Sequence, residues 1–217
     1  MAAAAQTRPV VVELFTSQGC SSCPPAETFI GELARRPDVL ALTFHVDYWN
    51  DLGWRDRFSS PDATRRQNVY ARELGLRSVF TPQAVIDGQS NFVGSNRSPI
   101  ENATRNARTG VPIVLSVHDG LVVADIGTQG NGASGNVLLV AYLNSAVSPI
   151  GRGENAGRTI QETNVVRSFR SIGRWDGRHQ DFQVSLQSMP QDATDVAVLV
   201  QRLPQGAIVG AAHISLK

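Results

Sequence analysis

The sequence predicts an α/β domain, with a central mixed sheet flanked by helices, followed by an all-β, sandwich-like domain. Up to about residue 110, apolar strand-like runs alternate with segments of helical periodicity. After residue 111 the helical patterns almost disappear, and short strand-like runs are separated by Gly, Asn and Ser turns. We therefore predict a disordered or non-native N-terminus at 1–8, an α/β domain at 9–110 and a β-rich domain at 111–217.

Strands and helices alternate in the first of these domains. In the segment after residue 23, the apolar residues Ala26, Phe29, Ile30 and Leu33 recur three and four apart, which indicates one buried helix face. The expected elements are a strand at 10–15, a helix at 24–36, a strand at 39–47, a helix at 61–74, a short hairpin of 84–87 and 91–93, and a helix at 99–108.

Short strands follow one another in the second domain, and their number suggests a β-sandwich. We expect them at 113–118, 121–126, 137–143, 163–172, 181–186, 193–202 and 207–214. A long loop at 151–158 is expected to reach back over the first domain. Its polar residues, which either hold the domains together or bind an anion, are Arg152, Glu154, Asn155 and Arg158.

The charge pattern excludes some classes of partner. The formal net charge is +1, and acidic and basic residues alternate without a long block of one sign, so nucleic-acid binding is not expected. No run approaches the ~20 apolar residues that span a bilayer. The start of the chain, small residues followed by Gln6, is typical of the surroundings of a signal-peptidase cut, so we expect a periplasmic or secreted protein.

Both cysteines of the chain, Cys20 and Cys23, lie within four residues of each other, between a predicted strand and a predicted helix. A dithiol at this spacing is typical of thioredoxin-like redox chemistry, and the order of the elements around it is the thioredoxin arrangement. A cysteine at a helix N-terminus has a lowered thiol pKa, because amide protons and the helix dipole stabilise the thiolate. We expect Cys20, open to solvent, as the nucleophile and Cys23 as the resolving thiol.

A Thr-Pro pair precedes the predicted hairpin. Thr81 and Pro82 stand where thioredoxin-like proteins hold a cis-proline facing the dithiol. We predict a cis bond here, which leaves the Thr81 backbone free to pair with an extended substrate segment.

Several longer motifs resemble the bacterial family called domain of unknown function 1223, whose members are thioredoxin-like and often exported. The resemblance covers nearly the whole chain and implies a thioredoxin-like fold with a β-rich C-terminal part, without an assigned substrate. The motifs are the runs 12–26, 45–50, 53–56, 81–84, 153–159 and 164–167.

Glu13 is the candidate for a carboxyl group that accepts a proton from the dithiol. Glu13 lies seven residues before Cys20, whereas the buried aspartate of thioredoxin lies six before its first cysteine. Glu13 is either a buried proton acceptor for Cys23 or a residue of the other strand face paired with a surface arginine.

A second polar group stands at the end of the strand at 39–47. If Leu42 and Phe44 point one way, His45 and Asp47 share the opposite face and form an acid/base or ligand pair, unless His45 is structural. The aromatic residues nearby either grip a partner or belong to the core. The candidate substrate-binding residues are Gln18, Asp47, Tyr48, Trp49 and Trp54.

Three functions follow. We favour thiol–disulfide exchange with a protein thiol or disulfide, through Cys20, Cys23, Thr81, Pro82 and Glu13, without a cofactor. Copper binding and delivery through Cys20, Cys23 and His45 is the alternative, because two thiolates and an imidazole suit Cu(I). The third is a non-catalytic interaction module with an inert disulfide. The direction of exchange, the partner and the oligomeric state are not determined by these patterns.

Overall fold

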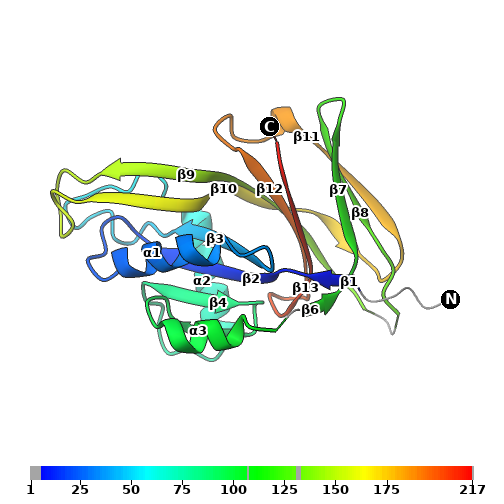
Figure 1. Cartoon of the computed structure of the whole chain (residues 1–217), viewed down its shortest axis with the longest axis horizontal. Helices are drawn as coiled ribbons and strands as arrows, with labels where there is room; N and C mark the ends of the chain where they lie inside the picture. Colours follow the sequence, from blue (N-terminus) through cyan, green and yellow to red (C-terminus); the bar gives the residue numbers. More distant parts are fainter. Residues whose placement is uncertain (1–5, 107, 131–132, 217) are drawn as a thin grey trace.

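The computed structural model describes residues 6–106, 108–130 and 133–216, and strands dominate it (Figure 1). About 44% of the described residues are strand and 16% are helix. The helices are α1 (Pro24–Leu33), α2 (Pro61–Glu73), α3 (Arg97–Ala103) and the short 3-10 helix η1 (Leu186–Ser188). The strands are β1 (Gln6–Arg8), β2 (Val10–Thr16), β3 (Val39–His45), β4 (Gln83–Ile86), β5 (Ser90–Val93), β6 (Arg108–Gly110), β7 (Ile113–His118), β8 (Leu121–Ile126), β9 (Gly135–Pro149), β10 (Thr159–Trp175), β11 (Gln180–Ser185), β12 (Asp195–Gln201) and β13 (Ile208–Ser215).

One eight-stranded mixed sheet runs through both halves of the chain, in the order β13-β12-β9-β10-β3-β2-β4-β5. The first half contributes β2, β3, β4 and β5, with β2 parallel to β3 and antiparallel to β4. The second half joins it where β10 pairs in parallel with β3, Val165 opposite Thr43. A three-stranded sheet, β11-β8-β7, and the small pair β1-β6 complete the architecture.

The predicted fold class is therefore wrong. The chain is not a helix-flanked, thioredoxin-like α/β domain followed by a separate β-sandwich, because it is mostly β and its main sheet takes strands from both halves. The local elements of the first half were predicted well, but their sheet continues into β10, β9, β12 and β13. The domain boundary near residue 110 stays a prediction.

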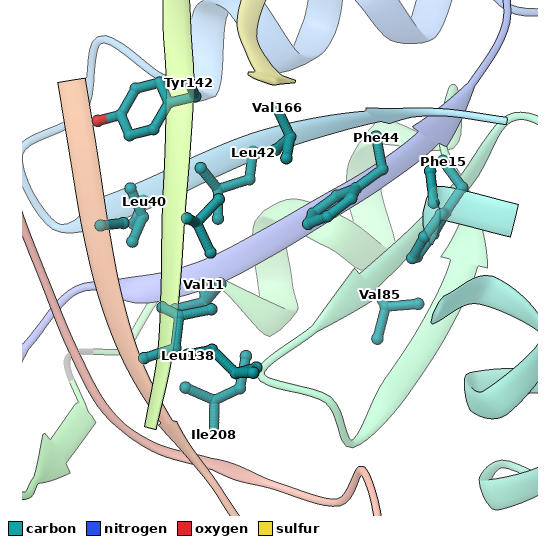
Figure 2. Packing of buried hydrophobic residues seen from close by; sticks show 14 of the residues in the cluster. Val11, Phe15, Leu40, Leu42, Phe44, Val85, Leu138, Tyr142, Val166 and Ile208 are labelled. Atoms are coloured by element: carbon teal, nitrogen blue, oxygen red, sulfur yellow. The ribbon is translucent and has the colours of Figure 1, made fainter. Parts of the chain in front are cut away.

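The main apolar cluster also draws on both halves (Figure 2). Leu40 and Leu42 of β3 lie among buried residues of the second half such as Leu138 of β9 and Ile208 of β13. A second cluster packs β7 and β8 against β9 and β12, with the fully buried Trp175. Burial of this kind stabilises a fold by about 25 cal/mol for each Å² of apolar surface removed from water, so the two halves stabilise each other.

Two strands are much longer than predicted. β9 and β10 form an antiparallel hairpin of 15 and 17 residues, which includes 144–149 and 159–162, residues outside the expected strands. The hydrogen bonds between β9 and β10 pair the backbone N–H and C=O groups whether the side chains are apolar or polar. A prediction from apolar residues alone therefore makes these strands too short. The predicted long loop at 151–158 is the turn of this hairpin.

At the N-terminus, residues 1–5 of the segment predicted to be disordered lie outside the described residues. Residues 6–8 of that segment form β1, which pairs with β6. Within the described residues, no helix has both the length and the apolar character needed to cross a bilayer.

We expect residues 6–110, expressed alone, to lack a cooperative thermal transition, because the second half supplies about half of the main apolar cluster. Near-ultraviolet circular dichroism with a thermal melt measures this, against the full chain as the control. A cooperative melt of the fragment would contradict the expectation and support an independent domain ending near residue 110.

Candidate functional site

A disulfide joins Cys20 and Cys23, whose Cα atoms lie 5.5 Å apart. Cys20 follows β2, and Cys23 is the N-cap residue of α1. Pro24 and Pro25 begin the helix, where a missing amide proton costs no helical hydrogen bond. The pair therefore lies at the strand-to-helix connection that the spacing indicated.

Both sulfurs are covered, contrary to the expectation that Cys20 is open to solvent. Cys20 is 0% exposed and Cys23 is 1% exposed, whereas Ser21 and Ser22 between them are exposed. The Sγ atom of Cys20 lies 3.3 Å from the Oγ atom of Ser22 and 3.8 Å from the carbonyl oxygen of Thr81. A partner can reach this disulfide only after a local movement.

The amide groups of this loop are largely engaged with oxygen acceptors other than the sulfurs. The amide of Cys20 donates to the carbonyl of Ser17, and the amide of Cys23 donates to the carbonyl of Cys20. The amide of Ser21 donates to the Glu154 carboxylate at 3.2 Å. The simple picture of amide protons converging on Cys20 is therefore incorrect for the disulfide form.

The Thr81–Pro82 bond is cis, as predicted, and lies beside the disulfide. Trp49 is held in the same place, because its indole Nε1 donates to the Oγ1 atom of Thr81 at 2.9 Å. The structure thus brings Cys20, Thr81 and Trp49 together.

Glu13 lies in a different environment from the one a proton acceptor for Cys23 requires. Its side chain is fully buried and accepts a hydrogen bond from Arg66 Nε at 2.6 Å, while the hydroxyl of Tyr70 donates to its other oxygen. Both partners come from α2. Glu13 is an ion-paired residue of the α2 side of the sheet, and the arginine is buried rather than at the surface.

Gln18 is the centre of a buried network instead of an open substrate contact. Its Nε2 donates to Glu162 at 2.5 Å and to Ser148 at 3.0 Å, and its Oε1 accepts from the indole of Trp54 at 2.9 Å. The backbone amide of Gln18 donates to Asp56 at 2.8 Å. These bonds connect the cysteine loop to β9 and β10.

His45 pairs with Asp56, which sequence reasoning did not single out, and not with Asp47. Its Nδ1 lies 2.7 Å from Asp56 Oδ2, with both side chains buried. Burial by itself lowers the pKa of His45, but the negative charge of Asp56 outweighs this effect and, with Glu27 and Glu162, raises that pKa to about 9. His45 is therefore protonated at neutral pH, and Nδ1 donates to Asp56.

The remaining predicted contacts lie toward α2. Asp47 accepts a hydrogen bond from Thr64 at 2.5 Å, and the hydroxyl of Tyr48 donates to Gln67 at 3.2 Å. Tyr48 is 38% exposed, so part of its ring faces solvent.

Glu27 is an acid that the sequence analysis missed. It lies one helical turn after Cys23, and its amide donates to the Cys23 carbonyl at 3.1 Å. Its side chain is 4% exposed, and Oε2 has no hydrogen-bond partner among the described residues. Burial raises the pKa of Glu27 to about 7, against the opposing effects of the His45 charge and the Thr16 hydroxyl. A spacing of four residues from Cys23 is the signal that points to it.

A groove of about 500 Å³ runs along this side of α1, between the helix and the start of β10. Glu27 lines it, together with Pro24, Arg35, Arg158 and Thr163 among others. Glu27 is therefore the buried acid nearest in sequence to the resolving cysteine, with access to a polar groove.

The copper alternative stays a prediction. In the disulfide form the two sulfurs are bonded to each other, and His45 Nδ1 is occupied by Asp56. In the part of the chain that the structure describes, three candidate metal-ligand atoms within 4.8 Å of one another come from Asp125 of β8, Asp181 of β11 and His179 just before β11.

These features define a mostly β protein whose large mixed sheet carries a Cys-Ser-Ser-Cys disulfide at a strand-to-helix connection. The chain belongs to the family described as "Protein of unknown function (DUF1223)", whose model matches residues 11–201. The crystal structure of a protein from Agrobacterium tumefaciens is similar, with 31% sequence identity and a TM-score of 0.84, over 97% of this chain and 96% of that chain. The comparison with curated proteins gave no match. The family membership predicted from the motifs is confirmed, and the thioredoxin likeness gains no support from these matches.

Replacing Glu13 by Ala tests whether this residue is structural. The Glu13→Ala variant leaves the buried Arg66 guanidinium without its counter-charge, so we expect the free energy of unfolding to fall by about 3–5 kcal/mol in urea titrations. The control is Glu32→Ala, which removes a partly exposed ion pair with Arg97 and is expected to have a much smaller effect. Equal losses in the two variants would contradict this assignment.

Replacing Glu27 by Gln tests its raised pKa. Because the folded-state pKa of about 7 lies above the ordinary 4.5, the folded chain binds this proton more tightly than the unfolded chain does. The contribution of Glu27 to the free energy of unfolding is therefore fully present below pH 4.5. It is lost as the pH rises through about 7, and the loss is about 3 kcal/mol. Urea unfolding of Glu27→Gln should lack this fall, whereas the Glu32→Gln control keeps it. A wild-type slope in Glu27→Gln would show that Glu27 titrates normally.

Proposed function

We propose that the protein carries out thiol–disulfide exchange with a protein partner through Cys20 and Cys23. The observation that carries this proposal is the disulfide at the start of α1, beside the Thr81 carbonyl and bracketed by the exposed Ser21 and Ser22. A disulfide that closes so short a loop constrains the unfolded chain little, so stabilisation alone explains it poorly.

In the reduced protein, the Cys20 thiolate attacks one sulfur of a partner disulfide. A Cys20–partner bond forms, and the other partner sulfur leaves as a thiolate. The Cys23 thiolate then attacks Cys20 Sγ, which restores the Cys20–Cys23 bond and releases the second partner thiol. Two electrons pass from the protein to the partner, and the reverse sequence oxidises a partner dithiol.

Deprotonation of Cys23 requires a base, and we propose Glu27 for that role in place of Glu13. Its position one turn after Cys23, its burial and its pKa of about 7 support this assignment. A base with a pKa near the working pH accepts and returns protons most effectively.

We propose that the partner approaches over the exposed Ser21 and Ser22, with Tyr48 and Leu52 as apolar contacts that are 38% and 57% exposed. Behind these apolar contacts we place Trp49, which is hydrogen-bonded to Thr81, and Trp54, which is hydrogen-bonded to Gln18. Because disulfides persist in oxidising compartments, we propose the bacterial periplasm or the exterior as the place of action.

The test is the dithiothreitol-driven reduction of insulin, followed by turbidity. We expect the wild type to accelerate it, Cys20→Ser to abolish the acceleration, and Cys23→Ser to accumulate a mixed disulfide detectable by mass, because the resolving thiol is missing. The variant Val114→Ala, at an exposed position of β7, is the control and should keep the activity. A wild type that fails to accelerate reduction, with Cys20→Ser and Cys23→Ser combined leaving partner binding intact, would favour the interaction module instead.

A further inference from the structure

The turn between β9 and β10 comes from the second half of the chain but contacts the cysteine loop of the first half. Figure 1 shows this hairpin end on the same side of the molecule as the start of α1. The turn is closed by backbone hydrogen bonds of 2.8 Å between Ile150 and Arg158 and between Gly157 and Ile150. It is therefore an ordered part of the surroundings of the disulfide.

Two consecutive residues of this turn hold one peptide group of the Cys-Ser-Ser-Cys loop. Asn155 Nδ2 donates to the carbonyl of Cys20 at 2.9 Å, and Glu154 Oε2 accepts from the amide of Ser21 at 3.2 Å. The carbonyl and the amide of the Cys20–Ser21 peptide are thus both bound by the turn. Asn155 Nδ2 also donates to the carbonyl of Gln18 at 2.9 Å, so the chain is held on both sides of Gly19.

The turn is itself held in place. Asn155 is 0% exposed, whereas Glu154 is exposed. Gly153 has a φ of +75°, and a Cβ atom there would lie 3.1 Å from the Cβ atom of Trp54. Since Trp54 is bonded to Gln18, the turn packs against the same network that supports the cysteine loop.

We propose that Asn155 and Glu154 are positioning residues that favour the Cys20–Cys23 disulfide over the dithiol. This inference rests on the proposed function and adds the direction of exchange. We call Asn155 and Glu154, with their hydrogen bonds to the Cys20–Ser21 peptide, the clamp. In the dithiol, the clamp keeps Cys20 close to Cys23, and a high effective concentration of one thiol at the other favours the bond between them. The clamp also directs the Ser21 amide to a carboxylate, and the negative charge of Glu154 opposes a thiolate at Cys20.

A pair whose disulfide is favoured is a donor of electrons. The reduced protein would therefore reduce partner disulfides, because a stabilised thiolate is the feature of strong oxidants and the clamp works against it. The β-rich second half would thereby set the redox behaviour of the first.

The test is the equilibrium constant of the cysteine pair in glutathione buffers, read from alkylation and mass. We expect Asn155→Ala to shift the equilibrium toward the dithiol by about tenfold, which equals about 30 mV for a two-electron couple. Glu154→Ala should shift it in the same direction by about threefold and lower the pKa of the Cys20 thiol, measured from alkylation rates against pH.

The matched control is Thr43→Val, which removes a different hydrogen bond between the halves, from Thr43 Oγ1 to the Thr163 carbonyl at 2.6 Å. It should lower the melting temperature without changing the equilibrium constant. Asn155→Ala with a lowered melting temperature and a wild-type constant would reduce Asn155 to a structural residue and overturn the proposal.

Two further readouts keep the outcome decisive. If Asn155→Ala does not fold, Glu154→Ala decides, because Glu154 is exposed and a wild-type constant there overturns the proposal. The equilibrium constant of the Cys20–Cys23 pair with glutathione can be measured whether or not the protein is a catalyst. A wild type that is inactive on insulin therefore rejects the proposed function, while the shifts in the variants still test the clamp separately.

Discussion

The parallel pairing of β10 with β3 is the interaction on which the rest of this structure depends. It is short, with Val165 opposite Thr43, yet it joins the strands of the first half to β9, β12 and β13. The long hairpin of β9 and β10 then extends past β3, and its turn reaches the cysteine loop. The apolar cluster shared by both halves makes this pairing stable, because Leu40 and Leu42 of β3 are buried against residues of the second half.

Buried polar groups on the two faces of the sheet also hold the two halves of the chain together. On the α2 side, Arg66 binds Glu13 at 2.6 Å and Gln201 of β12 at 3.1 Å. On the α1 side, Gln18 binds Glu162 of β10. Buried charges and amides are costly unless they are paired, so each network requires both halves to be in place. The surroundings of the disulfide are consequently a product of the whole chain.

The sequence predicted those parts of the candidate site that depend on the local spacing of residues. The Cys20–Cys23 pair and the Thr81–Pro82 bond were found because short-range patterns specify them. Asp56 and Glu27 were missed as site residues, because their roles arise from burial and from contacts across the sheet. Asn155 was expected to hold the halves together or to bind an anion, but its contact with the cysteine loop was not predicted. The expected openness of Cys20 was wrong for the same reason, since exposure depends on neighbours that are distant in sequence.

By itself the sequence determined the family, the helices α1 and α2, most strands and the place of the disulfide, because periodicity, proline positions and cysteine spacing act within a few residues. It did not determine the fold class, because a strand carries no local mark of the strand that will pair with it. β10 pairs with β3 although Val165 and Thr43 are about 120 residues apart in the sequence. Only the tertiary structure decided that Glu13 belongs to an ion pair on the α2 side and that Glu154 and Asn155 hold the cysteine loop. Burial and long-range pairing are properties of the assembled sheet.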